Sequence, residues 1–204
     1  MARRSSPERR PFQRRGPTRE MRQRFLIVCE GETEAIYFDG LKRQRRLTSV
    51  VVKAVQARTS DPAMVVKQAS ERPDDENWDQ IWCVFDIEAP PKASSVPSIE
   101  NAREGGCRVA WSNPCFEVWL LLHYQDTSPP FETSKAAETE VRRHLPNFAK
   151  TSFVTADLLV LAEDAVKRAQ LLSGRHERIG VVPPGDNPNT LVGALVSELL
   201  RFAS

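Results

Sequence analysis

The chain has 204 residues, of which 40% are hydrophobic, and it carries a formal net charge of +2. This length suits one domain of ordinary size with a substantial hydrophobic core. The absence of any apolar run of roughly 18 residues argues against a transmembrane protein. The arginine-rich beginning is not followed by an apolar segment, which argues against a secretory signal and predicts a cytoplasmic location.

Positive charge is concentrated at the start of the chain. The first 24 residues contain nine arginines against only two acidic residues, Glu8 and Glu20. Prolines, a glycine and the lack of periodicity predict that residues 1–23 form a disordered arm, and that residues 24–204 form the folded domain. Two interpretations of the arm remain open, namely a solvated tail or an electrostatic tether to nucleic acid.

The first part of the domain alternates between apolar, strand-like runs and helical patterns. The expected strands comprise residues 25–29, 49–57, 80–86 and 107–112. The expected helices between and after them comprise residues 33–44, 60–71, 98–104 and 113–124. This alternation predicts an α/β fold with a doubly wound, mainly parallel four-stranded sheet.

The second part of the chain has a different character. A proline-rich break near residues 127–130 is followed by helical patterns at 134–145, 155–172 and 189–202. We therefore expect a sheet core over about 24–124 and a helical cover over about 130–204. The four cysteines form no closely spaced pair, which favours buried thiols over a disulfide framework or a zinc site.

Acidic residues follow two of the expected strands directly. Glu30 comes after the first strand, and Asp86 and Glu88 come after the third. In a parallel sheet the carboxyl ends of the strands share one edge, and residues two apart in an extended segment project to the same side. Converging carboxylates favour a hard divalent cation, so this pattern predicts a magnesium site. The alternative is that these residues cap helices or lie solvated in loops, and Glu32 and Glu34 fit that description.

Other polar residues lie in less polar surroundings. Glu117 is placed within an otherwise apolar helix, where a charge is costly unless it is paired or ligated, so we expect a site residue there. His123 ends the same helix, and two interpretations stay open: a catalytic group, or a side chain that contacts the last helix carbonyls.

Four stretches carry a resemblance to a known family: IVCEGETEAIYFDGL, IWCVFDIE, SNPCFEVWLLLHY and NPNTLVGALVSEL. From about Phe25 to its end, the chain resembles the RloB family, which is close to the AbiLii proteins of phage abortive infection. That family resembles the Toprim fold, which has a Glu after its first strand and an Asp-x-Asp pair after its third, together binding magnesium. Glu30 and Asp86 match this pattern, whereas Glu88 stands where the second Asp is usual. Lys150 is placed like a basic residue after the family's helical insert, where it would neutralise a transferring phosphate.

The resemblance implies a function and its partners. It implies a nuclease dependent on Mg²⁺ (or Mn²⁺) that hydrolyses DNA or RNA, tRNA included, in antiviral defence of the abortive-infection type. It also implies nucleic acid and an ATPase protein as partners, with a homodimer as an open alternative to a monomer. The main alternative function is a non-catalytic binding or regulatory subunit of an ATPase-containing defence complex. A third is nucleotidyl transfer, which the lack of a second catalytic domain disfavours.

Overall fold

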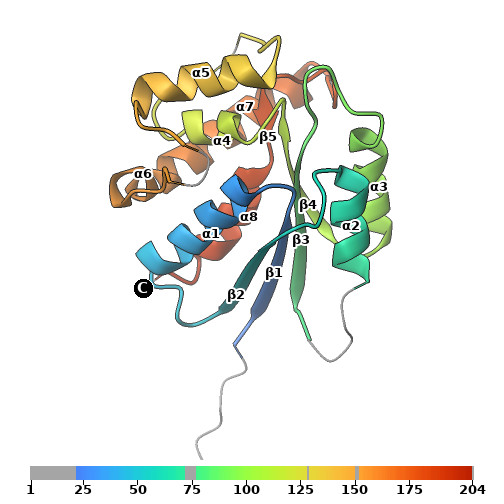
Figure 1. Ribbon diagram of the computed structural model, residues 1–204, viewed down its shortest axis with the longest axis vertical. Coiled ribbons are helices and arrows are strands. Elements are labelled where there is room, and N and C mark those ends of the chain that lie inside the picture. The colour runs from blue at the N-terminus through green and yellow to red at the C-terminus, as the bar shows by residue number, and fades with distance from the viewer. Residues whose placement is uncertain (1–21, 72–76, 128, 150–151, 204) are drawn as a thin grey trace, which may run out of the picture.

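A five-stranded sheet in the order β2-β1-β3-β4-β5 lies at the centre of the fold (Figure 1). The strands are β1 (Arg24–Cys29), β2 (Val51–Gln56), β3 (Gln80–Asp86), β4 (Arg108–Asn113) and β5 (Asn189–Thr190). The first four strands pair with one another in parallel, and β5 runs antiparallel to β4. The computed structural model describes residues 22–71, 77–127, 129–149 and 152–203, so the expected arm up to residue 21 and Lys150 lie outside the described residues.

Helices cover both faces of this sheet. They are α1 (Glu32–Gln44), α2 (Pro62–Ser70), α3 (Ser95–Glu104), α4 (Glu117–Leu121), α5 (Ser134–His144), α6 (Ala156–Val160), α7 (Ala162–Arg178) and α8 (Val192–Leu200). In Figure 1, α2 and α3 lie on one side of the sheet, and α1 and the helices from α4 onward lie on the other. The mixed α/β class and the four expected parallel strands are thus confirmed.

The hydrophobic core is divided by the sheet into two layers. The strands contribute alternate side chains to each layer, as a sheet covered on both faces requires. From β1, for example, Phe25 and Ile27 pack in the layer under α1 and α8, whereas Leu26 and Val28 pack in the layer under α2. Both layers are built on the same strands, so the strand ends are held rigidly from two sides.

The structure corrects three expectations about the elements. A fifth strand, β5, joins the sheet at the start of the helix expected over 189–202, so that α8 begins only at Val192; a strand of two residues gives no periodic pattern. The helix expected over 113–124 is only α4, because Asn113 continues β4 and the residue before a proline is restricted to extended backbone. The helix expected over 155–172 is divided into α6 and α7 by Leu161, and α7 continues to Arg178.

Two further features of the fold are the character of its helices and the state of its cysteines. Among the residues that the structure describes, no helix combines the length and apolar character that crossing a membrane demands. All four cysteines are buried free thiols, as the sequence predicted.

Candidate functional site

The carboxyl ends of β1 and β3 are joined directly, because these strands are neighbours in the sheet. The backbone N–H of Glu30 donates to the carbonyl oxygen of Val84 at 2.8 Å. In return, the Glu30 carboxylate accepts a hydrogen bond from the backbone N–H of Asp86, with Oε2 at 2.9 Å from the nitrogen. Glu30 and Asp86 are therefore fixed against each other at one edge of the sheet.

Glu88 reaches the same edge through an unusual backbone conformation. Its φ of 72° lies in the left-handed region, which is uncommon for a residue other than glycine. Its N–H donates to the carbonyl oxygen of Pro114 at 2.8 Å, and its Oε2 accepts from the hydroxyl of Ser134 at 3.0 Å. Asp86 and Glu88 do line the same pockets, as expected. The expected reason, an extended backbone that projects both side chains to one side, is wrong.

Two pockets adjoin at this edge and share three carboxylates. The first, of about 250 Å³, is lined by Glu30, Gly31, Glu32, Thr33, Glu34, Ser60, Asp86, Glu88, Phe116 and Glu117. The second, of about 290 Å³, is lined by Asp86, Glu88, Cys115, Glu117, Ser134, Lys135 and Glu138. We call the five carboxylates at positions 30, 34, 86, 88 and 117 the acidic cluster.

Asp86 lies at the electrostatic centre of the acidic cluster. Burial raises the pKa of its carboxyl group well above the ordinary value, and the negative charges of Glu34, Glu117, Glu30 and Glu88 raise it further. Each of the four other members thus acts on this one side chain. A group that repels its neighbours in this way favours either a proton or a bound cation.

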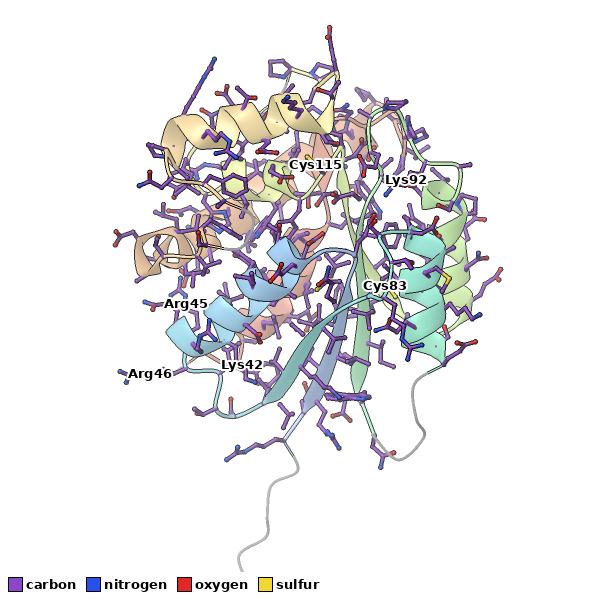
Figure 2. All side chains as sticks on the ribbon, in the orientation of Figure 1. Lys42, Arg45, Arg46, Cys83, Lys92 and Cys115 are labelled. Carbon is purple, nitrogen blue, oxygen red and sulfur yellow. The ribbon has the colours of Figure 1, made fainter. Side chains whose placement is uncertain are left out.

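Lys92 places a positive charge beside the acidic cluster, and sequence reasoning missed it. Its ammonium Nζ lies 2.7 Å from Oε1 of Glu30, 3.3 Å from Oε1 of Glu88 and 3.0 Å from the carbonyl oxygen of Ser60. Burial lowers the pKa of Lys92, but the hydrogen bond and charge of Glu30 and the charge of Glu88 more than offset this, so the pKa is raised. Figure 2 shows Lys92 and Cys115 at the same end of the molecule. The available signal was a lysine four residues after Glu88 in a proline-rich loop.

Glu34 is the second residue that sequence reasoning missed. It lies in the first turn of α1, as expected, but it is only 4% exposed, and its negative charge helps to raise the pKa of Asp86. A Cβ atom on Gly31 would lie 2.7 Å from Oε2 of Glu34, so the glycine makes room for this carboxylate. The signal was its spacing of four residues from Glu30, which was outweighed by the frequency of glutamate in helix first turns.

Glu117 begins α4 instead of lying inside a longer helix, and it is 5% exposed. The neighbouring Cys115 also lines the second pocket. Burial raises the pKa of the Cys115 thiol well above its ordinary value, and the charges of Glu117 and Asp86 add to this effect. The thiol therefore stays protonated near neutral pH, which argues against a cysteine nucleophile here.

His123 has a structural role in this geometry. Its Nδ1 lies 3.0 Å from the carbonyl oxygen of Trp119, which only accepts, so Nδ1 bears the proton. Its Nε2 then accepts from the hydroxyl of Tyr37 at 3.1 Å. Because Tyr37 belongs to α1, this bond connects the helix that bears Glu34 to the segment that follows α4 and Glu117.

We expect His123 to make the protein sensitive to mild acid. Burial lowers its pKa from the ordinary 6.5 to about 4. Between these values the unfolded chain binds a proton that the folded chain does not, so stability falls as the pH falls through this window. The loss should reach about 3 kcal/mol at pH 4. Chemical denaturation of the wild type and His123→Gln at pH 7 and pH 4 measures it, and equal losses in both proteins would contradict the assignment.

The site residues expected from the sequence thus fall into two groups. The structure brings Glu30, Asp86, Glu88 and Glu117 to the two adjoining pockets, and Lys150 is outside the described residues. Over the described ranges, no three His, Cys, Asp or Glu side chains stand already grouped as a metal site. Since Lys92 contacts both Glu30 and Glu88, a cation held by these two carboxylates would compete with its ammonium group.

Comparison with known proteins gives one match. A family model described as RloB-like protein matches residues 25–199. Neither the curated proteins nor the solved structures contain a match.

Proposed function

We infer the function from two premises: the chain belongs to the RloB-like family, and it gathers five carboxylates at one edge of its sheet. We propose that the protein is a nuclease dependent on Mg²⁺ or Mn²⁺ that hydrolyses phosphodiester bonds of DNA or RNA in antiviral defence. The observation that supports this most is that all five carboxylates of the acidic cluster line one pocket at the ends of β1 and β3.

The donor set of the acidic cluster fits a hard divalent cation. Carboxylate oxygens are the ligands that Mg²⁺ and Mn²⁺ prefer, and no thiolate or imidazole lines the pocket shared by all five carboxylates. Glu30, Asp86 and Glu88 would hold the ion, and Glu34 would extend the set. When bound, such an ion supplies Lewis acidity toward a phosphate oxygen and lowers the pKa of water.

The chain's own residues perform the other tasks in this proposal. Lys92 lies beside Glu30 and Glu88, from where its ammonium group donates to a phosphate oxygen of the substrate. Glu117, buried and shared by both pockets, accepts the proton of the attacking water. The rigid strand ends of β1 and β3 keep the reacting groups in place, which lowers the entropic part of the barrier.

Purified protein incubated with plasmid, single-stranded DNA and total tRNA tests this proposal. Each substrate is combined with Mg²⁺, Mn²⁺ or EDTA, with and without the ATPase partner that the family resemblance implies. We expect cleavage of at least one substrate that EDTA abolishes and that Glu104→Gln, an exposed charge change at the end of α3, leaves intact. Binding of nucleic acid or of the ATPase without cleavage under any condition would favour the regulatory alternative.

A further inference from the structure

The segment Asp186–Thr190, which we call the clamp, connects three other parts of the fold through its side chains. The Asp186 carboxylate accepts from the side-chain amides of Asn113 at 2.7 Å and Asn189 at 2.9 Å. Asn187 exchanges two hydrogen bonds with the backbone of Phe131, at 3.0 and 2.7 Å. The side chain of Asn189 accepts from Ser173 on α7 at 2.8 Å, and that of Thr190 lies 2.9 Å from the hydroxyl of Ser112 on β4.

Burial makes these bonds obligatory. Asp186 is 1% exposed, and Asn113, Asn189 and Thr190 are also buried. A buried carboxylate without hydrogen-bond donors costs much free energy, so two amide donors aimed at Asp186 are a requirement of the fold. The clamp therefore fixes the end of β4 and the start of the segment that leads into α5.

Both hydrogen bonds that hold the backbone and the Oε2 atom of Glu88 come from these same two places. Pro114, whose carbonyl accepts the Glu88 N–H, directly follows Asn113. Ser134, whose hydroxyl donates to the Glu88 carboxylate, lies three residues after Phe131. A glutamate keeps a left-handed backbone conformation only when the surrounding structure holds it there. The clamp fixes the positions of both partners of Glu88, Pro114 and Ser134.

We propose that Asp186 is a positioning residue that holds Glu88 in the acidic cluster and thereby sets the affinity of that cluster for a divalent cation. The part about the cation rests on the proposed function, whereas the part about Glu88 does not. The purely structural alternative is that Asp186 stabilises the whole fold evenly.

Because Asp186 accepts a hydrogen bond that Asn189 donates, swapping the Asp and Asn side chains between these two positions tests the proposal. In D186N, one amide oxygen must serve two amide donors, so one bond to Asn113 or Asn189 is lost. In N189D, two carboxylates face each other and repel. In the double variant D186N/N189D, the new amide at position 186 accepts from Asn113 and donates to the new carboxylate at position 189, which still accepts from Ser173. The double variant restores every bond without changing the net charge.

The first measurement is hydrogen exchange at the backbone amide of Glu88 in the full chain. In D186N and in N189D, we expect the Glu88 amide to exchange at least about 10-fold faster relative to other β3 and β4 amides. In the double variant, its exchange rate should return close to that of the wild type. T155A is the control, because it removes the Thr155 cap of α6 and lowers stability away from the acidic cluster. If D186N does not fold, N187A is a milder variant in which the same amide should exchange faster.

The second measurement is the Mg²⁺ or Mn²⁺ concentration that gives half the maximal rise in Tm. It should increase about 10-fold or more in D186N and recover in the double variant, as for other residues that orient metal ligands. Unchanged exchange at Glu88, or an even increase over the whole sheet, would overturn the positioning role. If the wild type shows no metal effect and no cleavage, the proposed function fails, and the exchange data still decide the role of Asp186.

Discussion

Replacing Asp86 with asparagine is expected to reduce metal-dependent cleavage by at least about 100-fold while leaving the fold intact. Asparagine keeps the shape of the side chain but removes its charge, and a neutral amide is a poor ligand for Mg²⁺. In the absence of metal, Tm should be equal to or higher than that of the wild type, because one member of a repelling cluster is neutralised. Added Mg²⁺ should then raise Tm less than in the wild type.

The pH dependence of this effect follows from the raised pKa of Asp86. A carboxyl group whose pKa is raised by folding costs stability at pH values above its ordinary pKa of about 3.9, and the cost is complete above its folded pKa. The stability advantage of Asp86→Asn should therefore be largest at pH 7 to 8 and shrink as the pH falls toward 4. Denaturation curves at several pH values, without metal, measure it.

Asp126→Asn is a matched control for this experiment. It is the same substitution at an exposed aspartate that contacts Arg168, outside the acidic cluster. It should leave cleavage unchanged and alter stability by at most about 1 kcal/mol. If Asp86→Asn instead lowered stability and kept normal cleavage, Asp86 would be a structural residue and the proposed site would be wrong.

Replacing Lys92 with methionine is expected to change stability and cleavage in a way that depends on metal. Without metal, Glu30 is left buried without its cation, which should lower stability by roughly 1–2 kcal/mol. Added Mg²⁺ should raise Tm more than in the wild type, because the ion then enters the acidic cluster without displacing an ammonium group. Cleavage should nevertheless fall about 100-fold, since a charged donor to the phosphate is lost.

Lys67→Met is the control, because Lys67 is an exposed lysine whose ion pair with Glu71 lies on the surface of α2. The raised pKa of Lys92 keeps this residue charged across the pH range of these assays, so one pH suffices. Normal cleavage with tighter metal binding in Lys92→Met would show that Lys92 only competes with the cation and does not contact the substrate.

Sequence reasoning located the elements whose signals are local. The strand over residues 80–86 was predicted to the residue, because a continuous apolar run ends sharply at Asp86. The helix expected over 60–71 was predicted to within two residues of the observed start of α2 at Pro62, where the Asp61 side chain accepts from the backbone N–H of Ala63. The strand β5 was missed because its two residues pair only with the distant end of β4.

The acidic cluster shows the same division between local and distant information. Glu30, Asp86 and Glu88 were found because each follows an apolar strand, and parallel strands end at one edge. Glu34 was interpreted as a solvated residue of a helix first turn, whereas it is buried and lines a pocket with Phe116 and Glu117, which are distant along the chain. Lys92 was missed because only the path of a loop, which no periodicity describes, returns its ammonium to Glu30.

The distance along the chain between Glu88 and Asp186 determines when, during synthesis, the acidic cluster is completed. A ribosome that adds about 5–20 residues per second needs roughly 5–20 seconds to make the intervening hundred or so residues. Until Asp186 emerges, the first four strands have already been made, but the hydrogen bonds of Glu88 to Pro114 and Ser134 lack the anchors that the clamp provides. Under the proposed function, a nascent chain whose carboxylates are present but not yet held by the clamp would be inactive. Cleavage activity would therefore begin only after this delay, which would protect the ribosomal RNA and tRNA that are synthesising the protein.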